Sequence, residues 1–135
     1  MRFKFLDHTA DIKFIAYGKS LDELIENIAI AMFKSMYNGI VKKKIHKKIK
    51  VYGKDLENLI YNFLEELIFL METENFFLSD LKAKVDIKNK EIVAKLTGDD
   101  LRNYRIDIEV KSITYNEMKV SKEKEKWSCQ VVVDV

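Results

Sequence analysis

Acidic side chains gather near both ends of this sequence, and they are its first candidates for chemistry. Asp134 closes an apolar run, and the α-carboxylate of Val135 follows it. Near the start, Asp7 and Asp11 flank His8 in a short polar stretch. Carboxylate oxygens are hard ligands of the kind that Ca²⁺ and Mg²⁺ prefer. These residue types predict a divalent-cation site if the fold brings the two ends of the chain together.

Each of these acids also has an ordinary alternative role. Asp134 alone is more commonly a solvated acid at a strand end, because acids stay exposed unless they are paired. In the same alternative Asp7 or Thr9 caps a turn, and His8 is a hydrogen-bonded loop residue. If the strand that Asp11 begins lies beside the last strand, Asp11 and Asp134 converge. Carboxylates without a nearby base would then repel each other unless a cation or a proton lay between them.

A run of lysines is the second candidate feature, and it has two interpretations. Residues 42–50 contain six lysines. Such a stretch binds phosphates electrostatically, or it forms an edge strand that lysines protect from aggregation. The edge strand is favoured, because the stretch lacks the interleaved aromatic side chains on which single-strand binders stack bases.

Other catalytic patterns are missing from the sequence. It has no glycine-rich phosphate loop and no nucleophile elbow, and two histidines with one cysteine cannot form a Cys/His zinc site. Glu65 and Glu66 are adjacent on a predicted helix, so their side chains diverge by about 100°. Cys129 falls on the apolar face of a predicted strand, which indicates core packing. A hydrolase centre using a metal-bound water would need a base, and only His8 accompanies the acids.

Two helices must help to position the acids. The first begins at Ser20, where Glu23 completes a capping box by reaching back to the Ser20 amide. Apolar residues then recur with helical spacing until Asn38-Gly39 provides a left-handed stop. The second helix begins after Asp55 as N-cap and ends within residues 72–75.

Alternating apolar and polar residues predict the strands. Strands are expected at residues 3–6, 12–17, 40–52, 81–88, 92–96, 106–111 and 127–135, with a loop at 98–100 and a charged turn at 121–126. Alternation in the late strands implies one solvated face, which antiparallel sheets allow. The fold class is therefore α+β, with two helices packed on a mostly antiparallel sheet.

Composition sets the limits of this architecture. The chain has 135 residues, of which 47% are hydrophobic and 34% charged, with a net charge of +2. This length suits a single domain over residues 1–135, and the near-balanced charge excludes a polycation. The sequence shows neither a membrane-spanning run nor a signal peptide. A single cysteine fits a reducing compartment, so a cytoplasmic location without membrane attachment is expected.

Four segments resemble the archease family. Residues 5–12 (FLDHTADI) resemble the opening signature, and residues 18–23 (GKSLDE) are similar to the segment that follows it. Residues 109–118 (EVKSITYNEM) resemble the second signature, and residues 133–135 (VDV) resemble the terminal motif. The segments stand at both ends and in the expected order, so the resemblance covers essentially the whole chain.

The resemblance implies a non-catalytic accessory protein. Archeases assist the RtcB-type RNA ligase that joins tRNA exon halves, promoting its guanylylation and its repeated turnover. An alternative that the family also suggests is an RNA-binding chaperone that modulates tRNA methylation, with tRNA or a tRNA methyltransferase as partner. Here that role would fall to the basic surface.

The resemblance also assigns residues. Asp11 and Asp134 match the family's metal-binding acids, and Val135 matches the position that contributes a main-chain oxygen. Asp7 and His8 are supporting candidates. The expected ion is Ca²⁺, with Mg²⁺ or Mn²⁺ as alternatives. Three basic residues are candidates for contacts with the partner or RNA: Arg102, Arg105 and Lys111.

Overall fold

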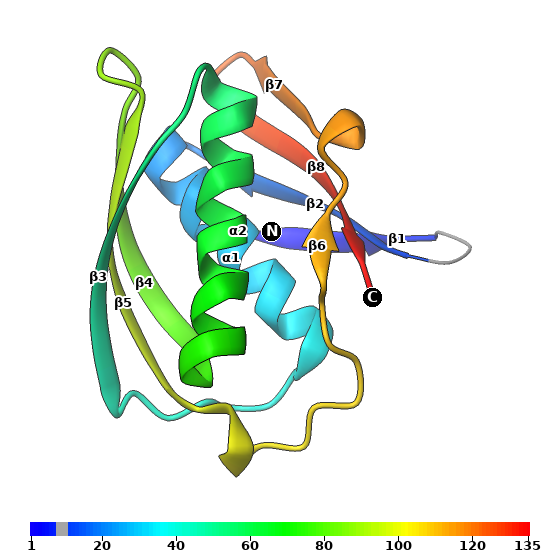
Figure 1. Cartoon of the computed structure of the whole chain (residues 1–135). Helices are drawn as coiled ribbons and strands as arrows, with labels where there is room; N and C mark the ends of the chain where they lie inside the picture. Colours follow the sequence, from blue (N-terminus) through cyan, green and yellow to red (C-terminus); the bar gives the residue numbers. More distant parts are fainter. Residues whose placement is uncertain (8–10) are drawn as a thin grey trace.

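Two helices lie between two antiparallel sheets in the computed structural model, which describes residues 1–7 and 11–135 (Figure 1). The helices are α1 (Leu21–Met36) and α2 (Leu56–Glu74). Within the described residues, no helix is long and apolar enough to cross a membrane. The predicted α+β class is confirmed, and the strands divide into two sheets rather than one.

The larger sheet contains residues from both ends of the chain. It has five strands, β1 (Phe3–Leu6), β2 (Ile12–Gly18), β6 (Ser112–Ile113), β7 (Lys119–Glu123) and β8 (Lys126–Asp134). Strand β2 pairs with β1 on one side and with β8 on the other. Strands β6 and β7 pair with different parts of β8, so they lie end to end along its other edge.

The second sheet has three strands in the order β3 (Ile45–Tyr52), β5 (Glu91–Asp100) and β4 (Phe76–Asp86). Strand β3 lies at an edge, as its lysines predicted. The opposite edge, on β4, is covered by α1. There the Ala83 N–H donates to Glu26 (2.9 Å) and the Val85 N–H donates to Asp22 (2.8 Å). Strand amides that would otherwise face solvent are thus bonded by two helix carboxylates.

Side-chain caps explain where both helices begin. The Ser20 hydroxyl accepts from the Glu23 amide at 3.1 Å, and Asp55 accepts from the Asn58 amide at 2.8 Å. Glu23 itself reaches the Lys19 amide rather than that of Ser20. These bonds satisfy amides that have no partner within the helix.

The helix ends differ from each other. Helix α2 ends as predicted, with Asn75 in the left-handed region (φ 56°). The predicted glycine stop of α1 is wrong, because Tyr37 leaves the helix in an extended conformation (φ −153°) and no glycine has a positive φ among the described residues. Burial of the Tyr37 ring against Phe77 and Tyr104 holds the chain in that direction.

One continuous core joins the helices to both sheets. Its largest fully buried side chains include Phe14 from the first sheet, Phe63 from α2 and Phe76 from the second sheet. Helix α1 contacts both sheets, so residues beyond its predicted apolar face, such as Ile30 and Phe33, are also buried. Burying a large apolar side chain contributes about 1.5–3 kcal/mol, so this shared core makes the layers interdependent.

Several strand boundaries differ from the predictions. Residues 40–44 are not strand, residues 98–100 belong to β5 rather than a loop, and β4 already begins at Phe76. The predicted strand at residues 106–111 is wrong, because none of these residues is in a strand although apolar and polar residues alternate there. Most of the predicted turn at 121–126 is β7 and the start of β8. These differences share one cause: pairing with a neighbour, and not alternation alone, makes a strand.

Candidate functional site

The two ends of the chain meet where β2 lies beside β8. Ile12 pairs with Val133, and the same register carried one residue further sets Asp11 opposite Asp134. Residues opposite each other in an antiparallel pair project to the same face. Asp11 is half-buried and Asp134 is exposed. The predicted neighbouring of the early strand and the last strand is confirmed, and the convergence of the two acid side chains stays a prediction.

Strand β6 holds the other side of Asp134. Ser112 pairs with Asp134, and the Lys111 amide donates to the Asp134 carbonyl oxygen at 2.8 Å. Strand β6 therefore fixes the backbone of Asp134, and the preceding residue, Val133, also pairs with β2. Ser112 places a half-buried hydroxyl beside it. Our sequence-based site did not include Ser112, although it belongs to the second signature.

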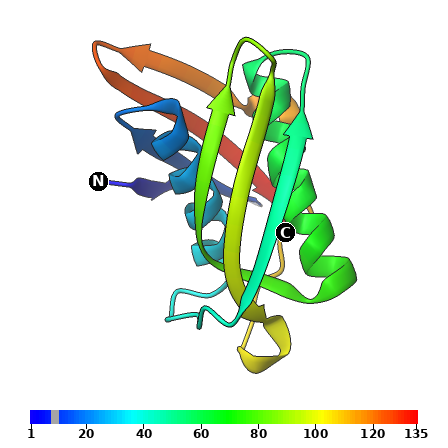
Figure 2. The same cartoon turned by 90° about the vertical axis from the view of Figure 1, so that its left-hand side faces the viewer.

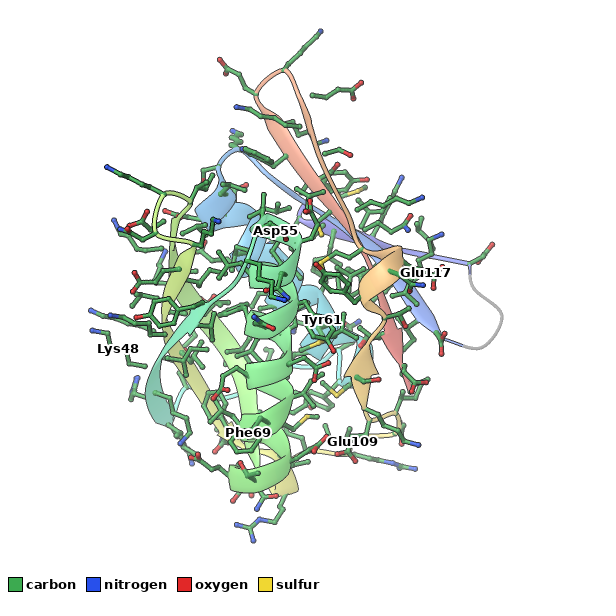
Figure 3. The ribbon with its side chains drawn as sticks, turned by 45° about the horizontal axis from the view of Figure 1, so that its top comes forward. Lys48, Asp55, Tyr61, Phe69, Glu109 and Glu117 are labelled. Carbon is green, nitrogen blue, oxygen red and sulfur yellow. The ribbon has the colours of Figure 1, made fainter. Side chains whose placement is uncertain are left out.

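Helix α2 anchors β6 in turn. The Ile113 amide donates to the Glu65 carboxylate at 3.2 Å. One helical turn away, Tyr61 packs edge-to-face on Tyr115 of the short helix η2 (Tyr115–Glu117), with ring centroids 5.1 Å apart. Figure 3 shows Tyr61 on the side of α2 that faces this segment. Burial, together with the nearby Glu65 carboxylate, raises the pKa of Tyr61.

The acid pair has the donor chemistry of a hard-cation site. Among residues 1–7 and 11–135, neither Asp11 nor Asp134 forms an ion pair with a basic side chain. Within the same residues, no group of three or more His, Cys, Asp or Glu side chains is arranged to hold a metal. Two carboxylates and nearby main-chain oxygens fit a cation that keeps several water ligands, as Mg²⁺ and Ca²⁺ do.

The other predicted ligands lie near the pair or outside the described residues. Val135 follows β8 and is half-buried against the core. Asp7 directly follows β1 and is exposed. His8 lies outside the described residues. Their roles as ligands stay predictions.

A shallow, mainly apolar pocket adjoins the acid pair. Asp11 lines it together with Phe5, Leu6, Ile12, Lys34, Ser35 and Asn38. The Phe5 side chain is 48% exposed there, although it also packs edge-to-face on Phe3 and Phe14. The exposed Phe5 ring and the Asp11 carboxylate give this pocket both apolar surface and charge.

The three predicted basic contacts occupy different environments. Lys111 is exposed and its backbone is bonded to Asp134, so it belongs to the acid-pair region. Arg102 lies in the short helix η1 (Leu101–Asn103), where its guanidinium donates to both carboxylate oxygens of Asp100 (2.9 Å to Oδ1 and 2.6 Å to Oδ2). Arg105 is highly exposed, with Asp107 as a loose partner at 3.4 Å. Only Lys111 is adjacent to the acids in the pairing of the strands.

A buried acid that the sequence placed in a loop proves to be structural. Asp99 is 4% exposed and accepts the Tyr104 hydroxyl at 2.7 Å, while that hydroxyl accepts from the Lys42 amide at 2.8 Å. The Tyr104 hydrogen bond is the main reason that the pKa of Asp99 is lowered. These bonds tie η1 to the segment before β3. Each polar group has a partner, so the cluster stabilises the fold.

Cys129 is a core residue, as predicted. It is fully buried on β8, and burial raises the pKa of its thiol to about 12. A thiolate is the reactive form of cysteine, so this side chain is chemically inert in the folded protein.

Comparison with known proteins covers the whole chain. A sequence model described as "Archease protein family (MTH1598/TM1083)" matches residues 3–135. Protein archease of Pyrococcus abyssi is 39% identical, with 99% of each chain covered. Protein archease of Methanosarcina barkeri is 37% identical, with 99% of this chain and 96% of that protein covered.

Two solved structures share the fold. The solution structure of protein 1598 from Methanobacterium thermoautotrophicum matches with a TM-score of 0.86 at 31% identity, covering 99% of both chains. The crystal structure of an archease from Thermotoga maritima, described as a possible chaperone, matches with a TM-score of 0.70 at 18% identity. That match covers 98% of this chain and 96% of the other.

Proposed function

The chain belongs to the archease family, and from this premise we propose that it is a cytoplasmic, non-catalytic accessory protein that activates an RtcB-type RNA ligase. The observation that carries the proposal is the pairing of Ile12 with Val133 at the end of the β2–β8 ladder, because Asp11 and Asp134 are the next residues of the two strands. It sets the terminal motif beside the opening signature. The description of the Thermotoga relative as a possible chaperone is in keeping with an accessory role.

The acid pair would hold a divalent cation. Asp11 and Asp134 supply carboxylate oxygens, Val135 is the candidate for a main-chain oxygen, and Asp7 and His8 are supporting candidates. Ca²⁺ is the first choice, with Mg²⁺ or Mn²⁺ as alternatives. When bound, the cation supplies positive charge that offsets the repulsion between the carboxylates. A site with two acidic side chains binds with moderate affinity, which suits an ion that must be exchanged with a partner.

The surrounding residues prepare this corner for a partner. Ser112 and the Lys111 amide fix the backbone of Asp134. Glu65 of α2 in turn holds β6, the strand that contains Ser112. The apolar pocket beside Asp11, with its exposed Phe5 ring, provides a surface on which a protein can pack. Together they would present a charged and ordered edge to the nucleotide-binding region of the ligase.

Ligation assays test this proposal. Single- and multiple-turnover joining of RNA by a cognate RtcB-type ligase is measured with the wild-type protein, with Asp11→Asn and with Asp134→Asn. We expect both variants to lose at least tenfold in stimulation while their circular dichroism spectra stay unchanged. Glu125→Gln removes an exposed carboxylate in the β7–β8 turn, away from the acid pair, and should stimulate normally.

Calorimetric titration with Ca²⁺, without ligase, gives an independent measure of the site. Wild-type protein and Glu125→Gln should bind, whereas Asp11→Asn and Asp134→Asn should bind at least tenfold more weakly. Equal stimulation by all four proteins would refute the acid pair as the working site. Failure of the wild-type protein to stimulate any cognate ligase would refute the accessory function itself.

A further inference from the structure

The second sheet turns one face to solvent, and this face is rich in lysine. In Figure 2 the strands β4, β5 and β3 lie in front of both helices, and no helix or strand of the described residues covers their outer side. Lys48 projects from β3 away from the helices (Figure 3). We define the outer lysine face by the exposed lysines that the three strands place there: Lys48, Lys50, Lys82, Lys84 and Lys95.

Strand register places these lysines in two adjacent rows. Lys48 pairs with Lys95, which pairs with Lys82, so three lysines lie side by side in one row across the sheet. Two residues along, Lys50 and Lys84 flank Val93. Neighbouring strands are about 4.8 Å apart, and two residues along a strand span about 6.7 Å. Five positive charges therefore originate from a small area of the sheet.

Acidic side chains flank these rows without interrupting them: Asp86 and Glu91 share the next row with Tyr52, and Asp80 lies in the row on the other side. Glu91 pairs with Lys50 at 3.1 Å, and Asp80 pairs with Lys43 at 3.6 Å. In the part of the chain that the structure describes, the other four lysines of the face form no ion pair. The protein has a net charge of only +2, so this face concentrates positive charge that the rest of the surface balances.

Edge protection accounts for the lysines of β3 but not for those of β4 and β5. Lys95 lies on β5, the central strand, which has no free edge to protect. Lys82 and Lys84 lie on β4, whose edge is already covered by Asp22 and Glu26 of α1. Like charges directly opposite each other in a sheet are destabilising. A row of three lysines therefore lowers the stability of the folded chain unless an anion occupies the face.

We propose that the outer lysine face binds the phosphate backbone of single-stranded RNA, independently of sequence. This rests on the sheet alone and not on the function proposed above. Lysine meets phosphate as a point charge, and the face has no arginine for bidentate contacts with base edges. Tyr52 lies on the same face in the next row and is 59% exposed. Its ring gives a base a surface on which to stack, as single-strand binders do.

Fluorescence anisotropy with a labelled, mixed-sequence RNA 20-mer over a range of salt concentrations tests the proposal without any ligase. Each phosphate contact with single-stranded nucleic acid contributes a slope of about −0.7 to log K against log salt. Five contacts predict a slope near −3.5. The variant Lys48→Gln/Lys82→Gln/Lys95→Gln should bind more than tenfold more weakly with a slope near −1.4.

A matched control separates this face from net charge. Lys4→Gln/Lys119→Gln/Lys124→Gln also removes three exposed lysines, all from the first sheet or its β7–β8 turn. We expect it to bind like the wild-type protein. Tyr52→Ser should weaken binding about tenfold without changing the salt slope, because stacking does not depend on counterion release.

Three results would overturn the proposal. The first is an absence of salt-dependent RNA binding by the wild-type protein. The second is equal loss in both triple variants, which would mean that net charge acts and not this face. The third is stronger binding to vesicles of anionic phospholipid than to RNA, with the same dependence on Lys48, Lys82 and Lys95. That result would assign the face to a membrane surface.

Discussion

Two adjacent carboxylates, Asp99 and Asp100, illustrate how neighbours with the same side chain acquire different roles. Asp99 is buried and bonded to Tyr104, whereas Asp100 caps η1 and holds Arg102. Arg102 lowers the pKa of Asp100 to about 2. Arg102 was predicted to contact the partner or RNA. Such a contact would have to form while the Arg102 guanidinium is also bonded to Asp100.

The Asp100–Arg102 pair should make the free energy of unfolding depend on pH in the acidic range. The carboxyl group of Asp100 has a pKa of about 3.9 in the unfolded chain and of about 2 in the folded protein. The lowered value stabilises the folded protein fully above about pH 4, and this contribution is lost as the pH falls toward 2. The urea midpoint should therefore drop less between pH 5 and pH 2.5 in Asp100→Asn than in the wild-type protein. An identical drop in both would show that the pair adds no stability, as for many exposed pairs.

At the scale of elements, Glu65 connects the longest helix to the shortest strand. Sequence analysis excluded Glu65 and Glu66 as a catalytic dyad and gave Glu65 no other role. Its carboxylate accepts the Ile113 amide, and the preceding residue, Ser112, pairs with Asp134. Strand β6 has only two residues, so this hydrogen bond is a large part of what fixes it.

We expect Glu65→Ala to loosen β6 selectively. A hydrogen bond to a charged group contributes about 1.5–3 kcal/mol, so amide exchange at Ile113 should accelerate about tenfold or more. Exchange in β4 and β5 should stay unchanged. Glu65→Gln keeps an acceptor oxygen and should behave like the wild-type protein. Equal exchange rates at Ile113 in all three proteins would mean that pairing with β8 alone holds the strand.

The elements were predictable where a local signal determines them. The Ser20 and Asp55 caps, the helical periods and the alternation in β4, β5 and β8 are all readable from residues close in sequence. Residues 106–110 alternate too, yet they are not a strand. Ile106 and Val110 turn toward the core, with the Val110 amide against the Met36 sulfur. Whether an alternating segment finds a partner strand depends on distant residues.

The same limit applies to the candidate sites. Asp11 and Asp134 were predictable because their motifs stand at the two ends of a recognisable pattern. Ser112 and Glu65 were not, because their importance comes from the strand and the helix that meet at β6. The outer lysine face was also hidden. Lys48 lies in the lysine run, but Lys82 and Lys95 join it only through strand register.

At the scale of the molecule, the helical layer separates two charged features. The acid pair belongs to the first sheet and the outer lysine face to the second, on opposite sides of α1 and α2 (Figure 1). If both proposals hold, the ligase and the RNA would therefore bind different surfaces of the protein. The shared core keeps the two sides in a fixed relation.

That shared core should make unfolding a single transition. Phe63 of α2 is fully buried between the sheets, and Phe63→Ala should cost about 3–5 kcal/mol of unfolding free energy. Trp127 on β8, the only tryptophan, reports on the first sheet. Its fluorescence and the far-ultraviolet circular dichroism should shift together in urea. Separate midpoints for the two signals would show that the sheets unfold independently.

The pairing of β2 with β8 also affects the order in which the chain can fold during synthesis. Strands β4 and β5 are neighbours in sequence and can pair as soon as both have been translated, whereas residues 12–18 must wait for residues 127–133. Contacts between such distant segments form late, because a long loop must be closed first. A nascent or truncated chain that lacks β8 therefore has no Asp134, and its β2 lacks the strand that pairs with it. The acid pair exists only in a chain whose translation has reached its last strand.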